Sequence, residues 1–453
     1  MTMNFPLMPF RKEFIYIKIT SPQTMKEFFE PKSIAVIGAS RNRGKVGNAI
    51  FRNLLRSKAK VYPINIKAKK VEGRKAYDKV FKVDLAIIAI PAPYVPQVLE
   101  ECGKVGVKHA IIISAGFSEV GRKDLSEEVL KIVRKYGIRV VGPNCLGIVN
   151  TRWMNATFFE GMPEKGGISI ISQSGALGVA LLDRMIEEGI GLSKFISVGN
   201  MLDLGIEDFV EYLNGDRDTK VIALYVESLK RGRKFLEVVK RCEKPVVVLK
   251  AGRGEAGKKA ASSHTGAMAG SFEVYDGVFR QYGLKRVDDV NEFFKLSQVL
   301  EKRTIKGKKV VVVTNAGGPG VLAADACEHF GMKMVKLPKE VIKELNSVLP
   351  SAWSHNNPID IIGDARAERY KKVFETLSKY DFYDLLLCIL TPQMMTEPEK
   401  TAVELAKLSR KKRCFACFMG GEKVKGAKKL LKRKGVLNFE EPWEAFKVLS
   451  KLS

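Results

Sequence analysis

Short apolar runs of strand length recur along the chain, and each is followed by a turn rich in small residues and then by an amphipathic stretch. The runs fall into three successive series, which cover residues 33–40, 60–65, 84–92, 109–117 and 139–147, then 167–175, 194–200, 221–228 and 245–252, and finally 309–318, 385–392 and 414–421. Continuous apolar strands that alternate with helices are typical of parallel sheets covered on both faces. The pattern therefore predicts an α/β fold with three doubly wound domains.

The predicted domains span residues 25–150, 151–300 and 301–453. Their boundaries fall in two polar or loop-like segments, 150–167 and 301–309. Residues 1–24 fit none of the strand-and-helix units and are expected to be an extension that is either non-native or disordered. Met25 stands just before the first unit, and one hypothesis is that it is the true start. An intact mass that includes Met1 or Thr2 would remove this hypothesis.

The composition excludes several classes of protein. The 453 residues are 45% hydrophobic and 28% charged, which suits ordinary soluble cores. No stretch approaches the ~20 consecutive apolar residues that a membrane helix needs. Seven scattered cysteines do not suggest a secreted disulfide framework. We therefore expect a cytoplasmic protein without a membrane partner.

The net charge of +27 predicts attraction to polyanions, which include nucleic acid, acidic lipid and phosphorylated cofactors. The strongest basic runs are residues 58–75 and 407–434, and aromatic residues do not interleave with them. Such runs are expected to form solvated faces, so no nucleic-acid partner is predicted. Retention on DNA at physiological ionic strength would revive that alternative.

Three turns between a strand and a helix are rich in glycine, serine or asparagine. The first, residues 38–47, is not a P-loop, because Val46 stands where a magnesium-binding Ser or Thr would be. Its glycines allow close approach of a phosphate, the following helix start offers free N–H groups, and Arg41, Arg43 and Lys45 favour an anion. Residues 172–176 and 315–320 repeat the arrangement, and two such helix starts could converge on one phosphoryl group. The alternative for the first turn is a tight connection without a ligand, and each of the other two could equally be such a connection.

Of the four histidines, His109 and His329 are expected to be structural and His355 to lie on the surface. His264 differs, because it stands among small residues in ASSHTGA and can project from a pliant loop. Neutral imidazole is a nucleophile near pH 7, so His264 is a candidate phosphoryl acceptor, and an ordinary loop residue remains equally open. Glu227, at the end of an apolar strand, is the candidate carboxylate to orient its ring; the alternative is a simple helix-start carboxylate.

Cys414 and Cys417 form a lone CxxC pair on an apolar strand, with no second pair or neighbouring histidine. Alternation along the strand would place the two thiols on opposite faces of the sheet. A structural role is therefore favoured over a metal site, and no metal ligand is predicted in this chain.

Taken together, the motifs resemble the α subunit of archaeal ADP-forming acetyl-CoA (acyl-CoA) synthetases, within the succinyl-CoA synthetase superfamily. The resemblance covers residues 25–453 and rests on PKSIAVIGAS, GKVG, VYPIN, SAGFSE, GPNCLG, ISQSGALG, SVGN, SSHTGA and NAGGPG, in this order. It implies a Rossmann-like CoA-binding domain followed by two flavodoxin-like CoA-ligase domains.

The resemblance also implies a set of site residues. His264 would be the phosphohistidine and Glu227 its supporting glutamate. Coenzyme A would be bound by Gly38, Ser40, Lys45, Pro63, Asn65, Pro91 and Ser114. Phosphate would be bound by Asn144, Ser172, Ser174, Gly175, Gly318 and Gly320. The implied reaction reversibly converts acyl-CoA, phosphate and ADP to acid, ATP and CoA.

The chain departs from the complete enzyme of this family, because it has no acidic ATP-grasp domain. ADP or ATP, with Mg²⁺, would bind mostly to a separate β subunit, and α₂β₂ is the expected assembly. The ending GVLNF (435–439) and the Trp353-Ser354-His355 insert are unusual for the family. The resemblance does not identify the organic acid. The alternative is a CoA-binding regulatory or protein-acyltransferase-related module without ligase activity.

Overall fold

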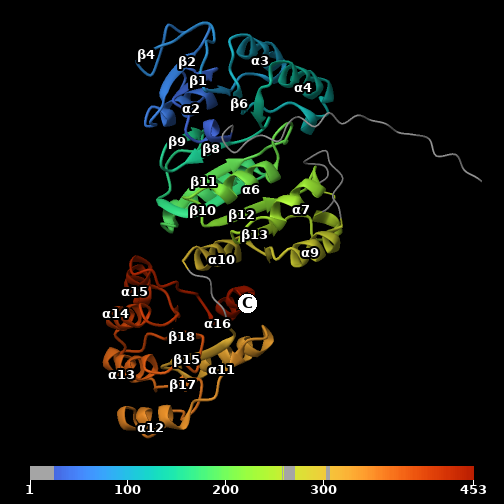
Figure 1. The fold of residues 1–453 in the computed structure, drawn as a ribbon. Helices are drawn as coiled ribbons and strands as arrows, with labels where there is room; N and C mark the ends of the chain where they lie inside the picture. The colour runs from blue at the N-terminus through green and yellow to red at the C-terminus, as the bar shows by residue number, and fades with distance from the viewer. Residues whose placement is uncertain (1–24, 258, 260–270, 303–306, 453) are drawn as a thin grey trace, which may run out of the picture.

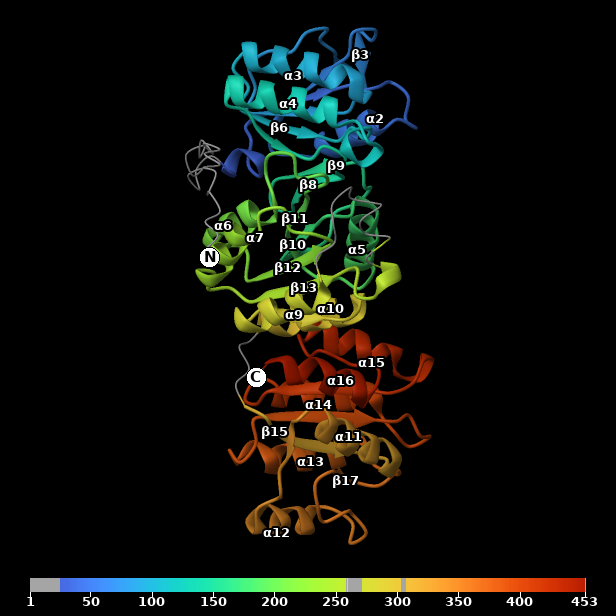
Figure 2. The same cartoon turned by 90° about the vertical axis from the view of Figure 1, so that its right-hand side faces the viewer.

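The computed structural model describes residues 25–257, 259, 271–302 and 307–452. These residues form three large sheets that are stacked along one long axis, with helices on the faces of each (Figures 1 and 2). The prediction of an α/β fold with three doubly wound units is confirmed. No described helix combines the length and the apolarity that crossing a lipid bilayer requires.

The first sheet is fully parallel and has the strand order β2-β1-β5-β6-β7. All of its strands except the edge strand β2 are almost wholly buried, because helices cover both faces, as continuous hydrophobic runs require. The strands are β1 (Ser33–Ile37), β2 (Lys60–Ile64), β5 (Leu85–Ile88), β6 (His109–Ile112) and β7 (Arg139–Val141). The helices are α2 (Val46–Leu54), α3 (Val95–Lys104) and α4 (Lys123–Tyr136), and β3 (Lys70–Val71) pairs with β4 (Arg74–Lys75).

The second sheet has the order β14-β13-β12-β10-β11-β8-β9 and is parallel from β14 to β11. Its strands are β8 (Gly147–Asn150), β9 (Met154–Thr157), β10 (Lys165–Ser172), β11 (Leu192–Ser197), β12 (Val221–Val226), β13 (Val246–Lys250) and β14 (Lys285–Val287). Its helices are α5 (Gly175–Glu187), α6 (Ile206–Gly215), α7 (Gly232–Lys240), α9 (Phe272–Gln281) and α10 (Val290–Lys302).

The third sheet has the parallel order β16-β15-β18-β19, and β17 also pairs with β15. Its strands are β15 (Lys309–Thr314), β16 (Lys333–Met334), β17 (Ile359–Asp360), β18 (Leu385–Leu390) and β19 (Cys414–Phe418). Its helices are α11 (Gly317–His329), α12 (Lys339–Val348), α13 (Ala367–Ser378), α14 (Pro398–Leu408), α15 (Glu422–Arg433) and α16 (Pro442–Leu449).

The antiparallel pair β8 and β9 corrects the expected boundary region. Residues 139–147 were expected to end the first sheet and 150–167 to be a loop, but β8 pairs with β11 and β9 pairs with β8 in the second sheet. The hairpin also packs on the first unit, where Asn53 Nδ2 donates to the carbonyls of Thr157 and Phe159 at 2.8 and 2.7 Å. These short strands lack a long apolar run, so the hydrophobic pattern alone did not reveal them.

Helices α10 and α16 lie between the second and third sheets in both views (Figures 1 and 2). Lys447 Nζ lies 2.9 Å from Asp289 Oδ2 and 3.2 Å from Glu292 Oε2, and Lys451 Nζ reaches the other oxygen of Glu292. The Glu292 side chain is only 2% exposed. Asn291 Nδ2 also donates to Glu444 Oε1 at 2.6 Å. Side chains at the start of α10 therefore hold α16 against the second unit.

Candidate functional site

The glycine-rich turns lie at the point of each sheet where the strand order reverses. In the first sheet the chain runs from β1 outward to β2 and then returns to β5 on the other side of β1. The same reversal occurs around β10 in the second sheet and around β15 in the third. Ligands of open parallel sheets bind in the crevice outside the carboxyl ends of the strands at such points. The topology thus selects the residues after β1, β10 and β15 as three candidate ligand edges.

The first edge depends on two glycines that let a helix and a turn touch. Gly38 follows β1 with φ +91°, and a Cβ there would lie 2.3 Å from the carbonyl oxygen of Ala89. A Cβ on Gly47, in the first turn of α2, would lie 2.1 Å from the carbonyl oxygen of Gly38. Only glycine permits this approach, which brings the positive end of the helix to the turn. The turn is thereby shaped for an anion.

Asn65 and Asn48 fix the backbone of this turn. Asn65 Nδ2 donates to the carbonyl of Ala39 at 2.7 Å, and Asn48 Nδ2 donates to the carbonyl of Ser40 at 2.7 Å. Ser40 Oγ accepts from the backbone N–H of Asn42 at 3.1 Å. Lys45, just before α2, is exposed. The structure thus brings Gly38, Ser40, Lys45 and Asn65 together at one edge.

Pro91 and Ser114 follow the neighbouring strands β5 and β6, so they belong to the same edge. Pro91 is exposed, and Ser114 Oγ donates to the carbonyl of Ile90 at 2.5 Å. Pro63 differs, because it lies inside β2 in register with Val36 and is buried. The contact of Pro63 with coenzyme A therefore stays a prediction from the resemblance.

Asn144 joins the first edge to the second unit. Its backbone N–H donates to the carbonyl of Ser114 at 2.9 Å, and its Nδ2 lies 3.3 Å from Oδ1 of Asn200, in the loop after β11. Asn200 Nδ2 donates to Glu119 Oε2 at 2.5 Å, and Lys230 Nζ donates to the Asn200 carbonyl at 2.6 Å. Burial, opposed by the N–H of Gly116 and by Asn200, leaves the pKa of Glu119 below its ordinary value. A network of amides and charges therefore surrounds Asn144.

The second edge is the start of α5. Ser174 is the N-cap, and its Oγ accepts from the backbone N–H of Leu177 at 3.2 Å. Ser172 is fully buried, and its Oγ donates to the carbonyl of Ser174 at 2.8 Å. The loop that contains Asn144 ends beside this helix start, since a Cβ on Gly175 would be 3.6 Å from the Leu146 nitrogen. The loop that contains Asn144 therefore meets the turn of Ser172, Ser174 and Gly175 at Leu146.

Glu227 lies across the reversal point from α5, at the end of β12. It is 7% exposed, and its backbone N–H and that of Ser228 both donate to Oε1 of Gln173. Gln173 stands between Ser172 and Ser174, so it connects the backbone at Glu227 to the predicted phosphate turn.

Two neighbours of Glu227 have shifted pKa values. Burial, the negative charge of Glu227 and a hydrogen bond with it raise the pKa of Tyr225 to about 12. Burial lowers the pKa of Lys250, against the opposing effect of Glu227, and Lys250 Nζ donates to the Glu227 carbonyl at 2.9 Å. A carboxylate in this setting can orient and charge-stabilise an imidazole that approaches from outside.

At the third edge, hydrogen bonds join the loop after β15 to the loop after β18. Asn315 Nδ2 donates to the carbonyl of Thr391 at 2.9 Å, and the backbone N–H of Thr391 donates to Asn315 Oδ1 at 2.9 Å. Gly318 is exposed and Gly320 is buried in the first turn of α11. Figure 2 shows α5 and α11 on opposite sides of the layer formed by α10 and α16. The expectation that the two helix starts converge on one phosphoryl group is therefore wrong within this chain.

His264 lies outside the described residues. Its role as the phosphoryl acceptor beside Glu227 and α5 therefore stays a prediction. His109 is buried with its ring 5.1 Å from that of Phe28, and His355 is exposed, as expected. His329 ends α11 and is exposed, so its expected structural role stays a prediction. Cys414 and Cys417 are both buried, in cores on opposite faces of the third sheet. Among the described residues, no three acidic, histidine or cysteine side chains gather into a metal-sized cluster.

Sequence reasoning missed the residues that connect the edges, namely Gln173, Asn200, Glu119 and Lys250. Gln173 and Asn200 each stand inside a motif that the sequence analysis names, ISQSGALG and SVGN. An amide side chain, however, is too common to indicate a functional site by its type alone. Lys250 offered a signal, because a lysine that ends the apolar run PVVVLK is unusual in a buried strand. The pairing of Glu119 with Asn200 spans 81 residues and could not be found without the fold.

Models of three families match successive parts of the chain: a CoA binding domain over residues 32–151, a succinyl-CoA ligase like flavodoxin domain over 165–300 and a ligase-CoA domain over 310–444. Among solved structures, an acetyl-coenzyme A synthetase 1 of Ca. Korarchaeum cryptofilum, described as dinucleotide forming and bound to phosphate and ADP, has a TM-score of 0.90 and 37% identity. The match covers 94% of this chain and 96% of that one. A Pyrococcus horikoshii OT3 protein gives a TM-score of 0.84 at 38% identity, with 94% and 98% covered.

Two curated relatives place the chain further. Acetate–CoA ligase [ADP-forming] I of Archaeoglobus fulgidus is 44% identical over 94% of this chain, which spans only 63% of that relative's length. The α subunit of acetate–CoA ligase [ADP-forming] II of Pyrococcus furiosus is 43% identical over 92% of this chain and 94% of its own. With a shared fold, shared motifs and nearly full mutual coverage, the chain belongs to the family of ADP-forming acetate–CoA ligase α subunits.

Proposed function

We propose that this chain is the α subunit of an ADP-forming acyl-CoA synthetase, which reversibly converts acyl-CoA, phosphate and ADP to acid, ATP and CoA. The observation that carries the proposal is the loop that contacts both the first and the second ligand edge. Asn144, in the loop after β7, donates its backbone N–H to the carbonyl of Ser114 on the first edge, and the same loop ends beside the capped start of α5 on the second. A thioester bound on the first edge and a phosphate bound on the second would meet at Asn144.

The first edge would bind coenzyme A. The start of α2, brought close to Gly38, and the exposed Lys45 suit the anionic diphosphate of the ligand. Ser40, Asn65, Pro91 and Ser114 would line the crevice that leads from there toward Asn144.

The second edge would direct the phosphoryl transfers. A phosphate oxygen attacks the thioester carbonyl carbon, the C–S bond breaks, and CoA leaves as the thiolate while an acyl phosphate forms. An imidazole nitrogen of His264 then attacks phosphorus, the bond to the acyl oxygen breaks, and the carboxylate leaves. An oxygen of the ADP diphosphate finally attacks the phosphohistidine and regenerates the imidazole. The N–H groups at the start of α5 stabilise the phosphate charge, and Glu227 orients the ring and balances its positive charge.

A separate β subunit would bind ADP, and Mg²⁺ would arrive with that nucleotide. Support comes from two P. furiosus relatives that are named as α subunits, which implies a partner subunit in those enzymes. An α₂β₂ assembly, a cytoplasmic location and the phosphate-directing role of Gly318 and Gly320 belong to the same proposal.

The experiment is phosphohistidine labelling. The chain is combined with its β partner and with ATP labelled in the γ-phosphate, and the α band is tested for acid-labile, base-stable label. Wild type and His355→Asn, which changes an exposed histidine, should be labelled, whereas His264→Asn should not. Glu227→Gln should retain the fold and slow labelling on the order of 100-fold, because an orienting carboxylate is lost. Label that persists in His264→Asn would overturn the proposal.

The alternative of a regulatory or protein-acyltransferase module is not favoured, because the relatives over nearly the whole chain are ADP-forming ligases. Release of CoA from acyl-CoA that depends on ADP and phosphate, screened across acyl groups, would also identify the acid.

A further inference from the structure

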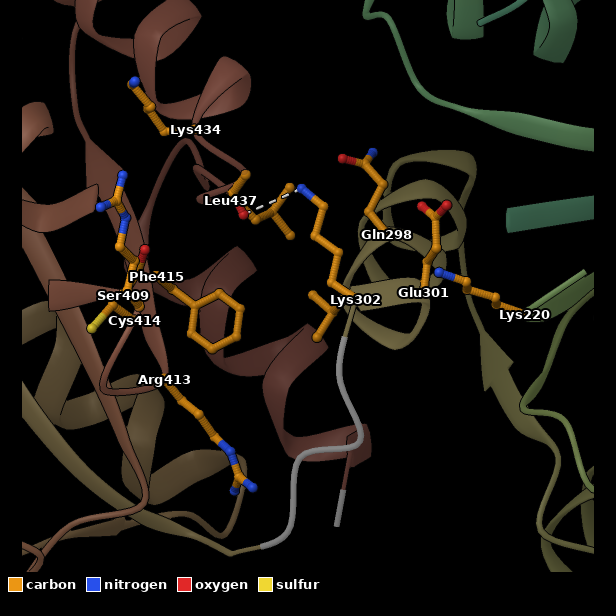
Figure 3. Close-up of a pocket in the computed structure, with 13 residues that line it drawn as sticks. Lys220, Gln298, Glu301, Lys302, Ser409, Arg413, Cys414, Phe415, Lys434 and Leu437 are labelled. Atoms are coloured by element: carbon orange, nitrogen blue, oxygen red, sulfur yellow. Dashed lines mark hydrogen bonds between the residues drawn. The ribbon is translucent and has the colours of Figure 1, made fainter. Parts of the chain in front are cut away.

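A basic cavity lies between the second and third units, away from the three ligand edges. It has a volume of about 480 Å³ (Figure 3). Lys220 precedes β12, Arg413 precedes β19, and Lys302 ends α10, so the cavity lies at the amino ends of strands in both sheets. The lining residues are Lys220, Gln298, Val299, Glu301, Lys302, Ser409, Arg410, Arg413, Cys414, Phe415, Lys434, Gly435 and Leu437. This position is opposite to the carboxyl edges where the proposed reaction takes place.

The cavity has a strong excess of positive charge. Five of its lining residues are cationic and one, Glu301, is acidic. Glu301 Oε1 already accepts the backbone N–H of Gly167 at 2.5 Å. Within the described residues, the side chains of Lys220, Arg410 and Lys434 form no ion pair. Like charges that face each other across a partly closed cavity repel, and the repulsion is screened less than on an open surface.

Lys302 stands at the centre of this charge. Its Nζ donates to the carbonyl of Gly435 at 3.2 Å, so it reaches from the second unit across to the third (Figure 3). Burial lowers the pKa of Lys302, against the opposing charge of Glu301. The neighbouring Gln298 points into the same space and adds a neutral hydrogen-bond donor.

A second cavity of about 270 Å³ continues the first, because both are lined by Gln298, Glu301, Lys302 and Leu437. It adds Lys295, Lys428, Lys429 and Lys432 from α10 and α15. Part of this charge is matched, since Lys428 pairs with Glu440 at 2.6 Å. The excess of positive charge in the first cavity therefore extends into the second cavity.

We propose that this cleft binds a diphosphate group, which would bridge the second and third units from their amino-edge sides. A compact anion with several charges suits cations on two facing walls better than a single charge does, because each wall can supply charge-assisted hydrogen bonds. Binding removes the repulsion across the cleft, and it therefore stabilises the packed arrangement of the two units. The diphosphate can be free pyrophosphate or the diphosphate of a nucleotide. The site is separate from the proposed reaction, so a failure of either proposal leaves the other standing.

The test compares two double variants that lose the same charge. Lys220→Gln with Arg410→Gln removes one cation from each wall, at exposed side chains. Lys336→Gln with Lys343→Gln removes two exposed lysines near α12, outside the cleft. Pyrophosphate, ADP and sulfate are each titrated into the full chain without its partner, and binding is measured by calorimetry and by the rise in Tm.

Pyrophosphate should bind wild type and the α12 double variant equally and should bind the cleft double variant at least about tenfold more weakly, since two charge-assisted contacts are lost. A parallel loss for ADP would identify a nucleotide diphosphate as the ligand, and ADP binding that is unchanged would identify free pyrophosphate. Equal binding of pyrophosphate to both double variants, or sulfate binding as tight as that of pyrophosphate, would overturn the proposal.

Discussion

At the scale of single residues, close contacts decide where the chain can bind a ligand. Gly47 and Gly38 meet backbone to backbone, and no side chain fits between them. Glycine in a helix is ordinarily less favourable than alanine, by about 1 kcal/mol. Its presence at the start of α2 therefore reflects the need to bring this helix end against the turn after β1.

Gly47→Ala is expected to lower the free energy of unfolding by about 1–3 kcal/mol, since the new methyl group would force α2 away from the turn. Affinity for coenzyme A should fall at the same time. Gly232→Ala is the matched control, because Gly232 also begins a helix but has no atom within 4 Å of an added Cβ. This variant should unfold at an equal or higher Tm. Chemical denaturation and a CoA titration measure both effects, and a Gly47→Ala protein as stable as the control would refute the contact argument.

Asp208 is a buried residue whose charged form stabilises the fold. It is buried at the start of α6, where its carboxylate accepts the backbone N–H of Gly205 at 2.8 Å and pairs with Arg231 and Lys234. Burial by itself would raise the pKa of Asp208, but these partners together leave it below the ordinary value. A depressed pKa stabilises the fold above the unfolded pKa of about 3.9, and the stabilisation is lost as the pH falls through the lower folded value.

Asp208→Asn should therefore be less stable than wild type at pH 6, by about 1–3 kcal/mol. The difference should shrink as the pH is lowered below about 4, because wild type loses the charge that the variant lacks. Urea unfolding at several pH values measures this, with the exposed Asp183→Asn as the reference. A difference that does not change with pH would contradict the role of the charge.

At the scale of elements, the start of α5 is the clearest case of a helix end that is both structural and chemical. Ser174 caps the helix through its hydroxyl, whereas Ser271 holds the equivalent N-cap position of α9 without a side-chain capping bond. An N-cap hydroxyl contributes about 1 kcal/mol to stability.

Ser174→Ala should lower the free energy of unfolding by about 1 kcal/mol and should also raise the phosphate concentration needed for half-maximal activity. Ser271→Ala should change the stability much less and leave the phosphate dependence alone. Equal losses in the two variants would show that the cap of α5 has no special role.

The elements also show what a hydrophobic pattern can predict. The strands β1, β5, β10, β12, β15 and β18 were expected from their apolar runs, because each is buried on both faces. The hairpin β8–β9 was not expected, since its short strands contain polar residues. Two of these, Asn150 and Asn155, are buried, and their side-chain amides donate hydrogen bonds to backbone carbonyls. The turns after β1, β10 and β15 were expected as sites, but the partners of Asn144 and Glu227 depend on long-range contacts that no local pattern encodes.

At the scale of the whole molecule, the third unit is attached through α16. Lys447 and Lys451 converge on the buried carboxylate of Glu292, and removal of both cations would leave that charge unmatched. Removal of one partner from a buried ion pair typically lowers the free energy of unfolding by about 3–5 kcal/mol. Because both lysines are partly exposed, the expected loss here is about 2 kcal/mol.

Lys447→Gln with Lys451→Gln should therefore uncouple the third unit, and calorimetry should show two unfolding transitions, whereas one is expected for wild type. Lys425→Gln removes an exposed lysine paired with the exposed Glu422 and should leave the transition unchanged. A single, unshifted transition in the double variant would mean that the apolar contacts between the units suffice.

The hairpin β8–β9 has a consequence for how such a chain can be divided. Only residues 142–146 separate β7 in one sheet from β8 in the next, and the hairpin then returns to contact α2 and the backbone before β1. A fragment cut between the two sheets would strip the first of part of its cover and would divide Asn144 from one of its two neighbours. Exchange of domains between relatives should therefore not occur at this junction. It should occur instead after α10, where the chain passes to the third unit, which contacts the second through side chains of α10 and α16.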